Sequence, residues 1–426
     1  MNISTFPSLA GYEIAECLYQ GTRTLVYRGT LQVDEKPVII KFLRNEYPSF
    51  SELVQFRNQY TIAKNLNIPG IVQPLTLENY RNSYALVMPD EGYVSLHSSV
   101  INQQLSISDF LNIAIQLADI LHGLYQNRVI HKDIKPANIL IHPKTKQIKL
   151  IDFSISSLLP KETQEIQNPN VLEGTLAYIS PEQTGRMNRG IDYRSDFYSL
   201  GITLYEILSG VLPFQSEEAM ELVHCHIAKC PIFPQTPHSI PDILKEIVMK
   251  LMAKNAEDRY QSALGLKYDL EQCLSQYLKN QDIEEFELGK RDICDRFIIP
   301  EKLYGREEEV AQLLAAFEKV ANPPKSPIPP QSPRSPGGKG KGGRSEMMLV
   351  AGFSGIGKTA VINEVHKPIV RQRGYFIKGK FDQFNRNIPF SAFVQAFREL
   401  MGQLLSETDT QLQEWKDKIL ATLGEN

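Results

Sequence analysis

Polar residues in the middle of the chain have the types and the spacing that phosphate transfer requires. They are His131-Lys132-Asp133-Ile134-Lys135-Pro136-Ala137-Asn138, and Asp152-Phe153-Ser154 begins fourteen residues further on. Asp133 is suited to orient and deprotonate an acceptor hydroxyl, and Lys135 to neutralise the γ-phosphate of ATP. Asn138 and Asp152 offer an amide and a carboxylate of the kind that hold Mg²⁺ against phosphate oxygens. The alternative is a polar loop that only caps neighbouring helices.

Residues 12–277 resemble the eukaryotic-type serine/threonine protein kinases of bacteria. The resemblance rests on the H-x-D-x-K-x-x-N run with its D-F, on Ser180-Pro181-Glu182 in the place of A-P-E, and on Arg259. It implies a bilobal α+β fold, with a small β-rich lobe, a larger helical lobe and the acidic residues between them. It also implies ATP and Mg²⁺ as cofactors and serine or threonine hydroxyls of proteins as acceptors.

The same resemblance assigns ATP-binding residues to the N-terminal part of the chain. Lys41 ends Val38-Ile39-Ile40-Lys41, like the strand whose lysine grips the α- and β-phosphates. Gly21 and Val26 fall where a glycine-rich loop usually covers the phosphates, and we expect the backbone at Gly21 to approach them. Met88 matches the residue that guards the adenine pocket, and Glu91 belongs to the hinge that follows it.

Four positions depart from the family pattern. Tyr19 and Thr24 replace the outer glycines, Ser154 replaces the glycine of D-F-G, and Gln59 stands where a helix glutamate usually holds the lysine. Because glutamine carries no charge, Lys41 should be less firmly oriented, which predicts weak activity. The departures leave an alternative open: a pseudokinase that serves a larger signalling protein as a nucleotide-binding scaffold.

Four further residues are expected to support the site structurally. Glu182 and Arg259 match an acid–arginine pair, and Asp196 matches the aspartate at a helix start that braces the catalytic loop. Thr175 matches the segment that receives the substrate. Together with Lys135, Thr175 favours serine or threonine acceptors over tyrosine.

A second nucleotide motif lies near the C-terminal end. Residues 352–359 fit G-x-x-x-x-G-K-T, in which Gly352, Gly355 and Gly357 let backbone amides wrap phosphates. Lys358 would reach the β- and γ-oxygens, and Thr359 would supply a magnesium ligand. No apolar strand ending in an acid follows in residues 360–426, so the sequence does not predict hydrolysis. A third hypothesis makes the chain a P-loop switch whose kinase lobe is a docking platform.

The order of the motifs resembles large bacterial trifunctional proteins, which carry a serine/threonine kinase, an AAA ATPase and later sensory and histidine-kinase domains. Leu303-Tyr304-Gly305-Arg306 is similar to the entry of AAA-type ATPases, and the missing C-terminal domains are expected signalling partners. The predicted organisation is a kinase domain at 1–278 (small lobe about 11–90, large lobe about 91–278), a connector at 279–303, an ATPase entry helix at 304–320, a Pro/Gly/Ser-rich basic linker at 321–346 and a truncated α/β P-loop domain at 347–426.

Hydrophobic periodicity predicts the elements that position these motifs. Strands are expected at 12–14, 25–27, 38–42, 71–75, 84–88, 139–141, 148–151 and 347–351. Helices are expected at 51–66, 110–124 with Ser108 as its cap, 195–209, 217–229, 241–253, 261–278 and 307–320.

The composition is that of an ordinary globular protein. The 426 residues are 42% hydrophobic and 22% charged with a net charge of −3, which predicts no binding to nucleic acid. No export signal and no apolar run long enough for a membrane span are apparent. The five cysteines fit reduced thiols and a cytoplasmic location. For His224-Cys225-His226 with Cys230, a zinc site and a helix of mixed faces are both considered.

Overall fold

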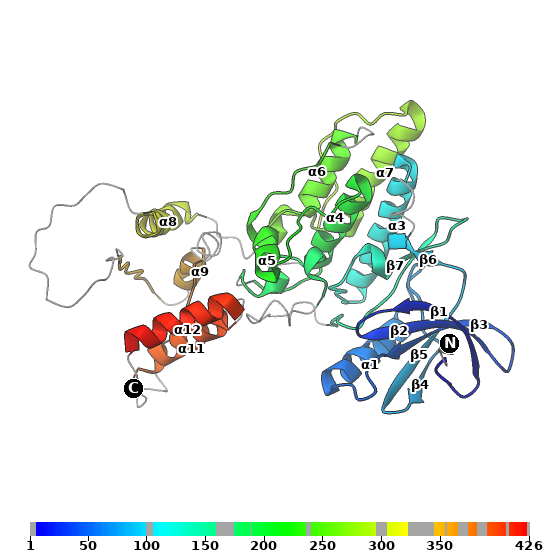
Figure 1. Ribbon diagram of the computed structural model, residues 1–426. Coiled ribbons are helices and arrows are strands. Elements are labelled where there is room, and N and C mark those ends of the chain that lie inside the picture. The colour runs from blue at the N-terminus through cyan, green and yellow to red at the C-terminus, as the bar shows by residue number, and fades with distance from the viewer. Residues whose placement is uncertain are drawn as a thin grey trace, which may run out of the picture.

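The computed structural model divides into a β-rich lobe, a helical lobe and a separate group of C-terminal helices (Figure 1). It describes residues 6–98, 105–158, 174–187, 189–235, 240–294, 305–322, 345–353, 356–364, 374–380, 390–405 and 409–423. Gly355, Leu303-Tyr304 and nearly all of the predicted linker lie outside these residues. Among the described helices, none is long and apolar enough to cross a membrane.

The first lobe is built on a five-stranded antiparallel sheet with the strand order β1-β2-β3-β5-β4. Val38, Ile40 and Phe42 alternate along β3 and are buried on one face, as a half-buried strand requires. Lys41 therefore projects from the opposite face. The strands are β1 Tyr12–Gln20, β2 Thr24–Leu31, β3 Pro37–Leu43, β4 Thr76–Tyr80 and β5 Ser83–Pro89.

Helix α1 (Phe50–Asn65) packs against β4 and β5 and carries Gln59 on its buried side. It begins with a capping box, in which Ser49 and Glu52 exchange hydrogen bonds between side chain and backbone. The strand predicted at 71–75 is wrong, since β4 starts at Thr76 and Ile71 forms only an isolated bridge to Leu150. Pro74 lies inside the predicted run and has no N–H to donate to a ladder.

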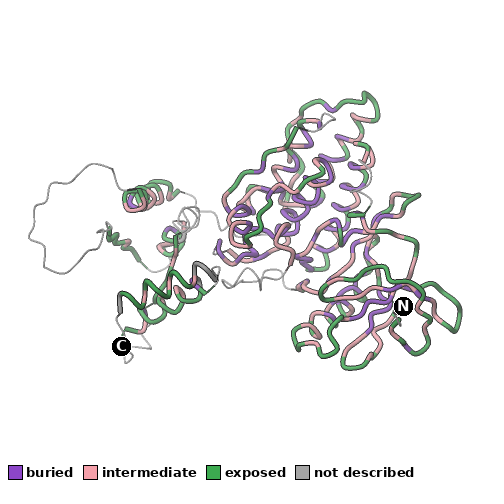
Figure 2. The backbone as a smooth tube through the Cα atoms, in the orientation of Figure 1, coloured by how far each residue is buried: buried purple, intermediate pink, exposed green. Residues whose placement is uncertain are grey.

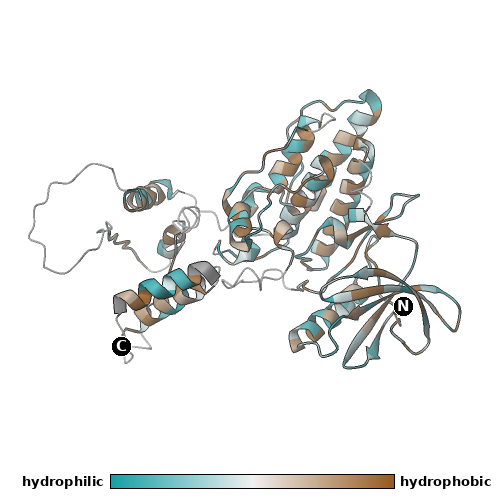
Figure 3. Ribbon diagram, viewed as in Figure 1, coloured by the Kyte–Doolittle hydropathy of each residue, from teal (hydrophilic) through white to brown (hydrophobic). Residues whose placement is uncertain are grey.

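The second lobe surrounds a continuous hydrophobic core in which α3 packs along α7 and α4 packs on α6. Figure 2 shows buried backbone concentrated in this lobe, and Figure 3 shows helices that alternate between hydrophobic and hydrophilic residues. The predicted helices of this lobe are confirmed to within a few residues. They are α3 Ile107–Gln126, α4 Arg194–Ser209, α5 Ala219–Ala228, α6 Asp242–Leu251 and α7 Ala263–Asn280.

One predicted detail of α3 is wrong. Its N-cap is Ser106, whose hydroxyl accepts the amide N–H of Asp109 at 3.1 Å, whereas Ser108 lies inside the first turn. The loop that carries His131 to Asn138 follows α3. The predicted hairpin comes directly after this loop and is confirmed. Its strands pair antiparallel with a short third strand: β6 Val94–Ser95, β7 Ile139–Ile141 and β8 Ile148–Leu150.

The described C-terminal residues form four helices and otherwise no regular structure: α8 Glu307–Ala321, α9 Lys358–Asn363, α11 Ser391–Leu404 and α12 Asp409–Leu423. The strand predicted at 347–351 is not formed. Met347 and Leu349 are 95% and 90% exposed, and no described strand lies beside them. A strand needs a hydrogen-bonded neighbour, which the described residues of this segment do not provide.

Candidate active site

Lys135 and Asn138 of the predicted catalytic loop, residues 131–138, both contact the carboxylate of Asp133, the predicted base. The Oδ2 atom of Asp133 lies 2.6 Å from Lys135 Nζ and accepts the Asn138 amide Nδ2 at 2.9 Å. The same Asn138 nitrogen donates to the Asp133 carbonyl at 2.8 Å. The other carboxylate oxygen, Oδ1, accepts the Thr175 amide N–H at 3.0 Å, and Lys135 also donates to the Thr175 hydroxyl. Thr175 thus joins this group of side chains from a segment about forty residues further along the chain.

Asp196 fixes the backbone of this loop from the first turn of α4. Its two carboxylate oxygens accept the amides of His131 and Lys132, each at 2.8 Å. Burial raises the pKa of Asp196, although these hydrogen bonds and the neighbouring His131 act in the opposite direction. Lys132 has a φ of 68°, so the loop makes a left-handed turn here that the two bonds hold in place.

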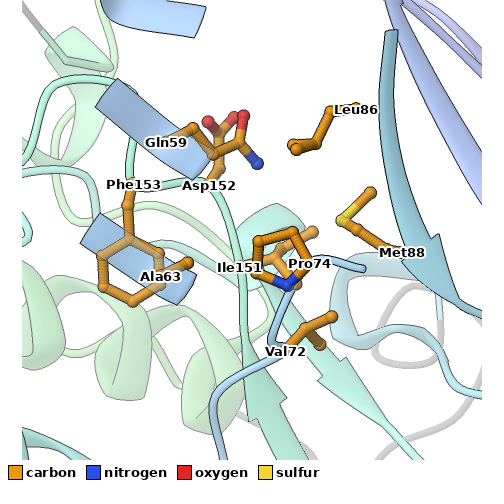
Figure 4. Close-up of a pocket in the computed structure, with 9 residues that line it drawn as sticks. All are labelled: Gln59, Ala63, Val72, Pro74, Leu86, Met88, Ile151, Asp152 and Phe153. Carbon is orange, nitrogen blue, oxygen red and sulfur yellow. The ribbon is translucent and has the colours of Figure 1, made fainter. Parts of the chain in front are cut away.

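Lys41, Gln59 and Asp152 meet across the cleft between β3, α1 and the segment after β8. Lys41 Nζ donates to Gln59 Oε1 at 3.0 Å and lies 3.1 Å from Asp152 Oδ2. Figure 4 shows the amide of Gln59 beside the carboxylate of Asp152. Burial opposes the charge of Asp152, but the charge and hydrogen bond of Lys41 outweigh it and lower the pKa of that carboxyl.

The residues fit a magnesium ion. The Oδ1 atom of Asp152 is buried and has no hydrogen-bond partner among the described residues, so this oxygen is available as a ligand. Asp152 is close to Asn138 because the amide of Ile151 donates to the Asn138 carbonyl at 3.0 Å. Asn138 itself is fixed through its amide nitrogen, which leaves its amide oxygen to act as the ligand.

A small pocket lies behind this cluster, and Met88 is part of its wall (Figure 4). Gln59 and Ala63 of α1 form one side, and Leu86 and Met88 of β5 face them. The residues before β4 and the segment after β8 complete the cavity, so four segments form it. The lining is Gln59, Ala63, Val72, Pro74, Leu86, Met88, Ile151, Asp152 and Phe153.

The other residues predicted to contact ATP, Gly21, Val26 and Glu91, do not line this pocket. The Gly21 N–H donates to the Thr24 carbonyl at 2.9 Å, so in this conformation the amide closes the hairpin turn. Val26 pairs with Lys41 across β2 and β3. The Glu91 carboxylate forms an ion pair with Lys149 of β8.

Sequence reasoning missed Asn58, which neighbours Gln59 on α1. Its amide Nδ2 donates to the carbonyls of Ser154 and Ser156 at 3.2 and 3.0 Å. These bonds attach α1 to the chain that follows Asp152. The next residue of the helix, Gln59, accepts from Lys41. No motif marks this residue, because the two partners lie about a hundred positions away in sequence.

Glu182 and Arg259 form a buried bidentate ion pair below the site. Arg259 Nη1 and Nη2 donate to the two Glu182 oxygens at 2.6 and 2.8 Å, and Ser195 donates to Glu182 at 2.6 Å. Burial would raise the pKa of Glu182, yet the Arg259 charge and hydrogen bonds lower it to about 2. Arg259 also donates to the carbonyls of Ala253, Arg194 and Lys254, so its guanidinium is fully used.

The P-loop motif is partly described, and Gly355 lies outside the described residues. Gly357 has a φ of 92°, and α9 begins at the next residue, Lys358, with Thr359 in its first turn. Lys358 Nζ donates to the carbonyls of Gly352 and Phe353 at 2.8 and 2.7 Å, so it folds back over the loop.

The two lobes, the cleft lysine and the acid–amide loop define a protein-kinase fold. The family model "Protein kinase domain" matches residues 12–274, and the chain belongs to this family. A second model, "AAA ATPase domain", matches residues 338–426. The predicted bilobal kinase class and the AAA-type segment after it are thus confirmed.

Curated relatives agree with this assignment. Hybrid signal transduction histidine kinase G of Dictyostelium discoideum is 33% identical over 76% of this chain, which covers 11% of that protein. Serine/threonine-protein kinase PrkC of Bacillus subtilis is 33% identical over 61% of this chain and 40% of its own length. Serine/threonine-protein kinase PknB of Mycobacterium leprae is 33% identical over 63% of this chain and 44% of its own. The chain thus spans less than half of each.

Proposed function

We propose that the chain is a serine/threonine protein kinase that transfers the γ-phosphate of ATP to protein hydroxyls. One observation carries the proposal: the Asp133 carboxylate is held by Lys135, Asn138 and Thr175, beside the Lys41–Asp152 pair. A nucleotide-binding scaffold needs the lysine and the metal-binding acid. It does not need an oriented carboxylate next to a lysine in the acceptor position.

The residues divide the work as follows. Asp133 orients the acceptor hydroxyl and takes its proton, and Lys135 offsets the negative charge of the phosphoryl group in flight. Lys41 holds the phosphates that stay behind. Asn138 and Asp152 would hold Mg²⁺, which would offset the negative charge of the phosphates. Thr175 contacts both Asp133 and Lys135, which supports serine and threonine as acceptors.

The test compares the unaltered chain with Asp133→Asn, using γ-labelled ATP, magnesium and a basic acceptor protein. Removing the base should lower transfer by about a hundredfold or more. Asp34→Asn is the matched control, since Asp34 lies in the turn between β2 and β3 and pairs with Lys36. Equal labelling by the Asp133→Asn protein and the unaltered chain would reject the enzyme and favour the pseudokinase.

We also propose that the AAA segment binds a second nucleotide through its P-loop. The support is the family match together with Lys358 and the glycine conformations at the start of α9. The test removes the first site with Lys41→Ala and Asp152→Ala, and then adds Lys358→Ala. Nucleotide retained by the double variant should be lost in the triple variant. Retention by the triple variant would refute the second site.

A further inference from the structure

The connector beyond α7, residues 281–294, is packed as part of the helical lobe. Ile283 is buried in the lobe's main core, and Phe286 and Leu288 pack against that core. The Gly289 amide donates to the buried carboxylate of Asp269 at 2.8 Å. The family model stops at residue 274, so the folded kinase lobe extends beyond the matched domain.

Asp292 attaches this connector to the start of α7. Its Oδ2 accepts the Gln261 amide at 2.7 Å, and its Oδ1 accepts the Ser262 amide at 2.7 Å and the Ser262 hydroxyl at 2.9 Å. Ser262 is the N-cap of α7, and its hydroxyl in turn accepts the Gly265 amide at 3.0 Å. A Cβ atom at Gly265 would come within 2.5 Å of the Asp292 Cα, so only glycine permits this approach.

The residues held by Asp292 lead directly to the start of α4. The Gln261 side chain accepts from Arg194 Nη1 at 2.9 Å and donates to the Arg259 carbonyl at 2.8 Å. The Tyr193 hydroxyl donates to the Gln261 carbonyl at 2.7 Å. Arg259 reaches back to the Arg194 carbonyl at 2.8 Å and forms the pair with Glu182. The connector therefore contacts Gln261, which in turn contacts Arg259, the partner of Glu182.

The same turn of α4 carries the residue that braces the catalytic loop. Asp196 follows Arg194 by two positions and accepts the amides of His131 and Lys132. A displacement of residues 261–262 would break the contacts of Gln261 with Tyr193 and Arg194 at the start of α4, where Asp192 is the other partner of Arg194. Such a change would loosen the turn of α4 that carries Asp196, and with it the backbone of the two residues that precede Asp133.

We propose that Asp292 is a positioning residue for phosphoryl transfer, acting through Gln261, Arg194 and Asp196 on the catalytic loop. This inference rests on the proposed kinase function. It places a control point in the segment that joins the kinase lobe to the AAA segment, so a pull on the connector lowers the rate of transfer. The Lys41–Asp152 pair makes none of these contacts, so ATP affinity should stay unchanged.

The experiment uses the full chain with Asp292→Ala, Asp292→Asn and Gly265→Ala. Because small displacements of positioned groups are costly, we expect kcat to fall about tenfold in Asp292→Ala and Gly265→Ala, with an unchanged KM for ATP. Asp292→Asn keeps one acceptor oxygen and should lose less. Glu287→Ala is the control, because Glu287 is a connector carboxylate that is 77% exposed and pairs only weakly with Lys290 at 3.3 Å.

Hydrogen exchange gives a readout that does not depend on turnover. The amides of residues 131 and 132 should exchange about tenfold faster in Gly265→Ala than in the unaltered chain, well below its unfolding midpoint. Unchanged kcat, or unchanged exchange at these amides, would overturn the inference. If the unaltered chain transfers no phosphate, the proposed function fails, and the exchange comparison still decides whether Asp292 positions the loop. Gly265→Ala is informative because alanine on its own favours a helix.

Discussion

Lys41 donates a hydrogen bond of 3.0 Å to the uncharged amide of Gln59, and its charge is directed to Asp152 at 3.1 Å. The glutamine thus keeps the geometry of a lysine–helix contact without its ion pair. This arrangement leaves Asp152 as the carboxylate that balances Lys41 when no nucleotide is bound. It also lowers the pKa of Asp152, so the acid is charged and ready for a metal.

Gln59→Glu should raise kcat/KM for ATP by about three- to tenfold, because glutamate would turn the hydrogen bond from Lys41 into an ion pair in a buried site and orient the lysine more firmly. The added carboxylate would draw Lys41 toward α1 and relieve its contact with Asp152. Steady-state kinetics at saturating acceptor measure the change. Gln55→Glu, one turn earlier on the same helix, controls for the added charge. A fall in kcat/KM would show that glutamine already orients Lys41 better than a carboxylate does.

Arg259→Lys should lower the free energy of unfolding by about 3 kcal/mol, although the charge is kept. Lysine has no planar fork, so it cannot satisfy both Glu182 oxygens and the three backbone carbonyls at once. Urea unfolding of the two proteins measures the difference. Arg57→Lys, at an exposed position of α1, is the control. A loss below about 1 kcal/mol would mean that the fork adds little.

Acid should destabilise the kinase lobe through Glu182. Its pKa is about 2 in the folded protein, below the ordinary glutamate value of 4.5, so its contribution is fully present above pH 4.5 and is lost as the pH falls toward 2. The shift corresponds to roughly 3 kcal/mol. Thermal unfolding between pH 6 and pH 3 should show this loss, and Glu182→Gln should flatten that part of the profile. A profile that Glu182→Gln leaves unchanged would contradict the assignment.

The polar residues of the proposed catalytic loop could be placed together from the sequence because they are consecutive. The run from His131 to Asn138 fixes which side chains share one loop, and Asp152 follows after a short hairpin that periodicity also identified. Helices were predicted for the same reason, since an apolar stripe is a local property. Errors occurred where a local pattern had two meanings, as at Ile71, which is buried but forms only a bridge.

Contacts between distant residues required the tertiary structure. Asn58 belongs to no motif, although its partner Ser154 does, and the 281–294 segment shows no periodicity that would predict its packing. A hinge role predicted for Glu91 did not reveal its ion pair with Lys149. Side chains of ordinary composition acquire such roles only when folding brings them together.

The amino-acid order alone determined the kinase class, the acid and amide residues of the loop, and the lysine and P-loop motifs, because these depend on residue type at short spacing. Only the tertiary structure decided that Lys41 pairs with Asp152, that Asn58 ties α1 to the chain after Asp152, and that Asp292 joins the connector to α7. Those relationships depend on distances between segments, which are set by how the core packs.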